Sequence, residues 1–314
     1  MYLNPLMVVR GVASYVPGAY RLSVGWTGGT GSARYCYSTW LRHLAYAYRS
    51  TGAPVPKRVA EIGPGDSLGI GLAALISGVD EYYAFDVVKY FNVEKNLKIF
   101  DELVALFSDR APIPGETEFP RVKPYMKTYE FPSDILTEER LRKAMEPGRL
   151  DRVRNAILHM NEPSGDIRIY FSPEWYDQSL IDEGTVDMIF SQAVMEHVDD
   201  LENGYKAMYR WLKRGGIMSH TIDFKCHGLA TRWNGHWAYS EATWKLLRGR
   251  LPYLINREPH STHVGLIRRN GFDIRLETRT ESGSGIDRRS LYKRFSRMSD
   301  EDLVTSDSFI LAVK

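Results

Sequence analysis

The sequence predicts an α/β fold in which strands and helices alternate around a largely parallel sheet. Three segments carry this prediction. Val59 to Gly69 is a short apolar strand that runs into a glycine-rich turn before an apolar helix, and Glu81 to Asp86 reads as a second strand ending in an acid. Val186 begins a further apolar strand that ends in the polar pair Ser191 and Gln192. Strands that alternate with helices in this way favour a parallel sheet, whose ligands bind beyond the carboxyl ends of the strands.

The glycine-rich turn is the first candidate binding element. Gly63 and Gly65 flank Pro64, and glycine permits positive φ and lets a ligand approach the backbone closely. Glu61 stands two residues before the turn, where we expect its carboxylate to face an amine-bearing or cationic ligand and to repel a pyrophosphate. Leu68 occupies the position of the third glycine in the dinucleotide-binding fingerprint, with Gly69 one place late.

Asp86 is the second candidate binding residue. It lies about 20 residues beyond the turn, at the distance where an acid commonly accepts hydrogen bonds from ribose hydroxyls. A glycine turn followed by such an acid indicates a nucleoside ligand. The acid before the turn favours S-adenosylmethionine over a dinucleotide.

Three segments resemble the motifs of class I S-adenosylmethionine-dependent methyltransferases, in the small-molecule, methyltransferase type 11-like branch. They are Glu61 to Gly69, Asp86, and the stretch Val186 to Val198. The resemblance implies a Rossmann-like sheet that is parallel except for one antiparallel final strand, with S-adenosylmethionine as cofactor. The cofactor-binding residues it implies are Glu61, Gly63, Pro64, Gly65, Asp86, Val87, Ser172, Ser191 and Gln192. Ser172 departs from the family pattern, which commonly has an acid there for the adenine amino group; Glu174 and Asp177 are weaker substitutes.

The domain organisation follows from the predicted elements. Residues 1–55 form an N-terminal helical leader with a helix over 32–48, and residues 56–314 form the methyltransferase domain. Within that domain, proline-rich residues 109–165 interrupt the alternation, so we expect an insertion that serves as a substrate-side lid or a dimerisation arm. The remaining expected helices are 70–77, 92–107, 201–212 and 261–269; the remaining strands are 166–171, 217–223, 272–280 and 309–313.

Composition excludes several classes of protein. The 314 residues carry a formal net charge of +2 and are 43% hydrophobic, which indicates a globular chain without a polyanionic partner such as nucleic acid. No apolar run reaches the roughly 20 residues of a membrane span. Cys36 and Cys226 have no paired-ligand spacing, so we expect free thiols and a cytoplasmic protein. The sequence does not determine the oligomeric state, and a homo-oligomer is one possibility.

Candidate catalytic residues cluster after the strand expected at 217–223. Methyl transfer to a hydroxyl needs a base, and His227, His220 and His236 are the candidates, in that order. His227 is preferred because the stretches Asp223 to His227 and Trp237 to Ser240 resemble a bacterial methyltransferase subgroup. His220 and Asp223 should lie on opposite faces of a strand, which argues against their direct pairing. His197 is either a base or part of a structural turn.

Other readings of the chain remain. His220, Cys226 and His227 are metal-ligand types, but their spacing fits no familiar zinc site, so the sequence predicts no metal. The basic residues within 287–297 form either a solvated face or an anion clamp for the acceptor. The acceptor predicted is a small molecule or glycan methylated on oxygen or nitrogen. The rivals are a catalytically inactive interaction scaffold with this fold and a nicotinamide-dependent oxidoreductase.

Overall fold

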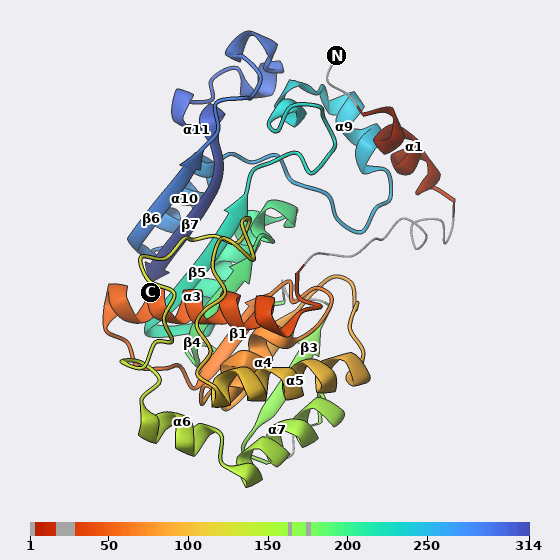
Figure 1. The fold of residues 1–314 in the computed structure, drawn as a ribbon. Helices are drawn as coiled ribbons and strands as arrows, with labels where there is room; N and C mark the ends of the chain where they lie inside the picture. Colours follow the sequence, from red (N-terminus) through yellow and green to blue (C-terminus); the bar gives the residue numbers. More distant parts are fainter. Residues whose placement is uncertain (1–3, 17–28, 163–164, 174–176) are drawn as a thin grey trace.

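The computed structural model describes residues 4–16, 29–162, 165–173 and 177–314, which surround one seven-stranded sheet (Figure 1). The strand order is β3-β2-β1-β4-β5-β7-β6, and only β7 runs antiparallel to its neighbours. This confirms the predicted Rossmann-like class I methyltransferase sheet with one antiparallel final strand. The strands are β1 (Arg58–Ile62), β2 (Glu81–Phe85), β3 (Arg168–Ser172), β4 (Val186–Gln192), β5 (Leu212–Asp223), β6 (Asp273–Glu281) and β7 (Thr305–Val313).

Two hydrophobic cores cover the two faces of the sheet. One core contains buried residues of α3 (Ala33–Thr51), α4 (Gly69–Ile76) and α5 (Val93–Ser108). The other contains those of α8 (Leu201–Trp211) and α10 (His260–Arg269). Every residue of α4 is buried, because this helix is apolar on all sides and lies between α3 and the sheet. The layers fix the carboxyl ends of β1, β2 and β4 relative to one another.

The expected leader helix is present as α3, which is capped at both ends. The Ser32 side chain accepts a hydrogen bond from the Tyr35 N–H, and Gly52 ends the helix in the left-handed conformation. Trp40 of α3 is fully buried in the first core, and its indole N–H donates to Ser77 just after α4. The leader helix therefore packs directly against α4.

The described residues of 109–165 contain two helices, α6 (Glu138–Ala144) and α7 (Pro147–Leu158). The preceding loop is tied to α3 by Arg42, which is fully buried and donates to the carbonyls of Pro114, Val122 and Pro124. None of the described residues of 109–165 lines the pocket reported below. Whether the insertion acts as a lid or as a dimerisation arm stays a prediction.

The remaining elements lie toward the pocket end of the sheet. Helix α1 (Pro5–Ala13) lies beside α9 (Glu241–Arg248), as Figure 1 shows. Gly11 makes this contact close, because a β-carbon there would lie 2.0 Å from the Leu246 carbonyl oxygen. Four short 3₁₀ turns and one helix complete the described elements: Met195–His197, Gly235–Ala238, Arg288–Ser290, Lys293–Phe295 and α11 (Asp300–Val304). Among the described residues, no helix has the length and apolar content needed to cross a bilayer.

Candidate active site

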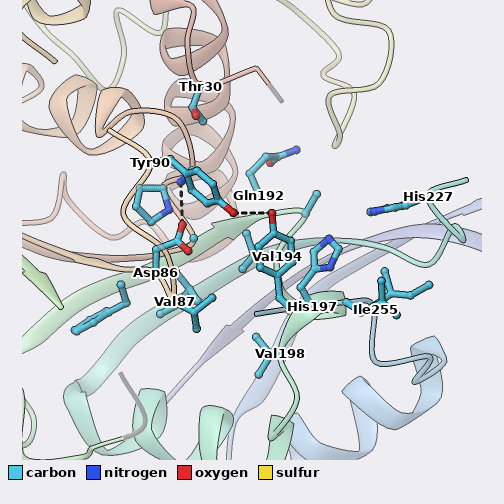
Figure 2. Close-up of a pocket in the computed structure, with 18 of the residues that line it drawn as sticks. Thr30, Asp86, Val87, Tyr90, Gln192, Val194, His197, Val198, His227 and Ile255 are labelled. Atoms are coloured by element: carbon cyan, nitrogen blue, oxygen red, sulfur yellow. Dashed lines mark hydrogen bonds between the residues drawn. The ribbon is translucent and has the colours of Figure 1, made fainter. Parts of the chain in front are cut away.

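A cavity of about 420 Å³ opens beyond the carboxyl ends of β1, β2 and β4. Figure 2 shows Asp86 and Tyr90 at one end of it and His227 and Ile255 toward the other. The lining combines apolar side chains with a few polar groups, which is typical of small-molecule sites. The lining residues are Met7, Arg10, Thr30, Tyr35, Ile62, Gly63, Pro64, Gly65, Phe85, Asp86, Val87, Tyr90, Gln192, Ala193, Val194, His197, Val198, His227, Leu229, Tyr253, Leu254 and Ile255.

The glycine-rich turn forms one wall of the cavity. Gly63 and Gly65 have φ values of 73° and 70°, so both adopt the left-handed conformation that glycine tolerates. The Gly63 N–H donates to the Phe85 carbonyl at 2.7 Å, which ties the turn to the end of β2. A β-carbon on Gly63 would lie 2.4 Å from a methyl group of Val194. The turn therefore requires glycine for its conformation and for its packing.

Asp86 lies where the turn meets the end of β2. Its carboxylate accepts hydrogen bonds from the N–H groups of Gly65 and Val88, both at 3.2 Å. Burial raises its pKa to about 6, although the backbone N–H donors act in the opposite direction. Val87, the next residue, is 44% exposed and lines the cavity. The geometry leaves the Asp86 carboxylate beside the turn, fixed by the backbone and facing the ligand space.

The far end of the cavity holds two histidines. His227 has a φ of 47°, which is uncommon for a residue with a β-carbon, and its Nε2 lies 3.4 Å from an Asp223 carboxylate oxygen. His197 belongs to the short turn Met195–His197, and its ring centroid is 5.1 Å from that of His227. Burial lowers the pKa of His197 to about 3, so this imidazole is neutral. His227 therefore lines the cavity beside an acid, with His197 next to it.

Glu61 does not face the cavity, contrary to the prediction from the sequence. Its side chain is buried on the α4 side of β1, is not among the lining residues, and accepts a hydrogen bond of 2.5 Å from the Tyr82 hydroxyl. Burial raises the pKa of Glu61 to about 8. The reason is the alternation of a strand: Glu61 points toward the helices, whereas the chain only turns toward the cavity after Ile62. Its observed role is to support the strand beneath the turn.

The three expected residues at the ends of β3 and β4 are placed differently from one another. Gln192 lines the cavity, as expected. Ser191 is fully buried and hydrogen bonds to His220 Nδ1 at 2.7 Å, so it faces the core and not the ligand space. The Ser172 carbonyl accepts from the Asp86 N–H, and Ser172 is absent from the lining. Asp177 accepts from Ser179 outside the lining, and Glu174 lies outside the described residues.

Two of the three candidate bases are also outside the cavity lining. His220 is fully buried in β5 between Ser191 and the second core, and burial lowers its pKa to about 3. His236 is 1% exposed and faces a separate, much smaller void. As expected, Asp223 does not pair with His220; it lies beside His227 and Lys225. Of the three candidate bases, only His227 lines the cavity, and its role as the base stays a prediction.

Four described residues of the N-terminal leader line the cavity. Met7 and Arg10 of α1, with Thr30 and Tyr35, line the cavity. Tyr35 and Tyr37 both belong to α3, but only one of them lines the cavity. Tyr35 reaches the cavity, whereas Tyr37 is fully buried and donates to the Ala111 carbonyl. Helical spacing places Tyr35 and Tyr37 on this helix but does not indicate which side of the helix faces a ligand.

The basic residues of 287–297 do not form an anion clamp on this cavity. None of them is in its lining, and two are engaged in ion pairs. Arg288 pairs with Asp300, and Arg294 pairs with Glu258. Cys36 and Cys226 are buried free thiols, as predicted.

One protein-family model matches part of the chain. Residues 173–219 match the family model described as a methyltransferase domain. No curated protein matches the chain. Among solved structures, phosphoethanolamine N-methyltransferase 2 from Haemonchus contortus, in complex with S-adenosylmethionine, aligns at 14% identity and a TM-score of 0.42 over 90% of this chain and 57% of that chain. A putative sarcosine dimethylglycine methyltransferase from Galdieria sulphuraria aligns at 12% identity and a TM-score of 0.43 over 88% of this chain and 84% of that chain.

These structural alignments are too distant to carry an argument about activity, and this chain spans 57% of the length of the Haemonchus contortus enzyme. The matched segment 173–219 contains β4, which supplies Gln192 to the cavity. The observed strand order includes the antiparallel final strand that the sequence motifs imply. The sheet has the strand order that the resemblance to class I S-adenosylmethionine-dependent methyltransferases implies, and residues 173–219 are similar to a methyltransferase domain.

Proposed function

We propose that this chain transfers a methyl group from S-adenosylmethionine to an oxygen or nitrogen atom of a small molecule or glycan. The observation that carries the proposal is a single cavity with a nucleoside-type site at one end and a histidine beside an acid at the other. Asp86 and the Gly63 to Gly65 turn form the first end, and His227 with Asp223 forms the second.

The donor would lie along the carboxyl ends of β1, β2 and β4. Its ribose hydroxyls would donate to Asp86, which already accepts from Gly65 and so cannot turn away easily. The turn residues Gly63, Pro64 and Gly65 would lie against the amino acid portion, because they present backbone without large side chains. Val87 and Gln192 are the remaining predicted donor contacts in the lining.

Methyl transfer makes modest chemical demands on the protein. The acceptor atom attacks the methyl carbon in line, the carbon–sulfur bond breaks, and sulfur keeps the electron pair as a neutral thioether. Holding the two reactants in line supplies most of the rate enhancement. A hydroxyl acceptor must also lose its proton, whereas a neutral amine can lose one after transfer.

His227 would accept that proton from a hydroxyl acceptor. Its Nε2 lies toward Asp223, so an N–H on that nitrogen can donate to the carboxylate and leave Nδ1 as the basic nitrogen. Asp223 has its pKa lowered to about 2, chiefly by His227 and Lys225 against the effect of burial, so it is ionised and can stabilise the imidazolium. This arrangement would orient the base at the acceptor end.

Calorimetric titration with S-adenosylmethionine and S-adenosylhomocysteine tests the donor site. We compare the parent chain with Asp86→Ala and with Asp134→Ala, which removes an exposed acid far from the lining. Loss of two hydrogen bonds to a charged group should cost about 3 kcal/mol, or roughly 100-fold in Kd. The Asp134→Ala control should bind as the parent does.

The other outcomes discriminate the rival functions. Equal binding by the parent and Asp86→Ala would contradict the ribose assignment. No binding of either ligand by the parent would contradict the proposal and favour an interaction scaffold. A parallel titration with NADH should give no heat of binding, since the turn lacks the third glycine of the dinucleotide fingerprint.

A further inference from the structure

Glu196 is a buried carboxylate without a hydrogen-bond partner of normal geometry. It is 2% exposed, and neither side-chain oxygen is paired. Burial and the nearby charge of Asp223 raise its pKa well above the ordinary range. An unpaired carboxylate inside a protein costs several kcal/mol unless it gains a proton or a cation. We therefore looked for groups around Glu196 that could bind a cation together with it.

Two histidines complete a cluster with Glu196. One ligand-type atom from each of Glu196, His197 and His227 lies within 4.8 Å of the others. The His197 Nδ1 is also buried without a partner, which leaves a lone pair or an N–H unused beside the carboxylate. His197 and His227 line the cavity (Figure 2), whereas Glu196 is buried and is not among its lining residues.

We infer that Glu196, His197 and His227 bind a divalent transition-metal ion of the zinc class at the acceptor end of the cavity. Two imidazoles and one carboxylate are the donor set of catalytic zinc sites, which keep one coordination position open. Bonds of 2.0 to 2.2 Å place ligand atoms about 3.5 Å apart in a tetrahedral site. The ligand atoms, which now lie within 4.8 Å of one another, would move closer by about an ångström when the ion binds.

Asp223 is suited to support such a site from outside the ligand set. Its carboxylate lies 3.4 Å from His227 Nε2, so this ring can present Nδ1 to a cation. Carboxylates that accept from the second nitrogen of a ligating histidine fix its tautomer and orientation. The left-handed backbone at His227, with a φ of 47°, holds its imidazole at the cavity, and such strained residues often occur at functional sites.

The open coordination position would face the cavity, because His197 and His227 both line it. It would take a water molecule or an oxygen of the acceptor. A cation and a proton compete for the same nitrogen of His227, so the metal-bound chain would not use His227 as a base. Metal binding itself does not depend on the donor, and its test is independent of the methyl-transfer proposal.

Equilibrium dialysis of the full chain against Zn²⁺ and Co²⁺, with metal analysis and the visible spectrum of the Co²⁺ form, tests the inference. We expect one ion per chain and a tetrahedral-type Co²⁺ spectrum. His227→Gln and Glu196→Gln should each weaken binding at least 100-fold, and Asp223→Asn by 10- to 100-fold. His159→Gln is the matched control, since it removes an exposed histidine next to Glu162.

A second variant distinguishes the loss of metal binding from a failure to fold. His227 is exposed to the cavity, so His227→Gln should fold even where the buried Glu196→Gln does not. Zn²⁺ should raise the Tm of the parent and of His159→Gln, and leave that of His227→Gln unchanged. Absence of binding to the parent, or equal binding by the parent and His227→Gln, would overturn the site and leave Glu196 as a protonated carboxyl.

Discussion

The Tyr90 and Tyr253 hydroxyls lie 2.9 Å apart and form a hydrogen bond that joins the loop after β2 to the loop after α9. Both residues line the cavity, and a dashed line in Figure 2 marks the bond between them. Tyr253 also contacts His197 edge to face, with ring centroids 5.4 Å apart. A ligand that spans the cavity must pass this bond or break it.

Removing either hydroxyl should therefore change the kinetics of ligand binding more than its equilibrium. In Tyr90→Phe and Tyr253→Phe we expect faster association and faster dissociation of S-adenosylhomocysteine, with Kd changed by less than about fivefold. Stopped-flow fluorescence measures both rates. A double-mutant cycle in urea should give a coupling of about 1 kcal/mol between the two hydroxyls. Additive effects on stability would mean that the bond does not form in solution.

Gly63→Ala should destabilise the fold and weaken donor binding. The new β-carbon would lie 2.4 Å from Val194 and would force a residue with a side chain to adopt a φ of 73°. We expect a loss of about 2 kcal/mol or more in the free energy of unfolding. Urea denaturation and donor titration measure the two effects.

Gly265→Ala is the matched control for Gly63→Ala. Gly265 lies within α10 and has no atom within 4 Å of its built β-carbon. Replacing glycine with alanine inside a helix should raise stability by about 0.5 to 1 kcal/mol. Similar losses in both variants would contradict the close packing assigned to Gly63.

The free energy of unfolding of Glu61→Gln should increase relative to that of the parent as pH rises. The pKa of Glu61 is raised from 4.5 to about 8 by burial, so between these values the folded state binds a proton that the unfolded state releases. The unfolding free energy of the parent therefore falls as pH rises through this window. The glutamine variant lacks this dependence.

Urea denaturation at pH 6.5 and 8.5 measures the difference. We expect the stability of Glu61→Gln relative to the parent to increase between these pH values. Its affinity for S-adenosylmethionine should stay within about threefold, because Glu61 is not in the lining. A tenfold or greater loss of affinity would instead support the direct contact between Glu61 and the ligand that the sequence predicts.

Donor binding should weaken as pH falls through the range set by Asp86. Its pKa in the free chain is raised to about 6, and ribose hydroxyls donate to the ionised carboxylate. Below this pKa, Kd should rise by up to about tenfold per pH unit, because protonation competes with the ligand. Titrations from pH 5 to 7 measure the effect, in a range where the ligand amino group stays protonated. Asp86→Asn should bind weakly with no such pH dependence, and a flat parent profile would contradict the assignment.

Local patterns in the sequence determined the elements and their order. The apolar strands, the glycine turn and the helical spacing of the leader predicted the sheet, α3 and the position of Asp86, because each depends on residues close together in the chain. The same patterns placed His227 beyond a core strand and separated it from His220. They could also predict that Asp223 does not pair with His220, since strand alternation is a local property.

Only the tertiary structure decided which side chains meet at the cavity. Glu61 and Ser191 lie near the carboxyl ends of β1 and β4, yet their side chains point into the core and form hydrogen bonds with Tyr82 and His220. The approach of Tyr90 to Tyr253 and of Glu196 to His227 joins segments far apart in the chain. Such contacts depend on how packed layers orient the loops, a long-range result of burying apolar surface that no short pattern encodes.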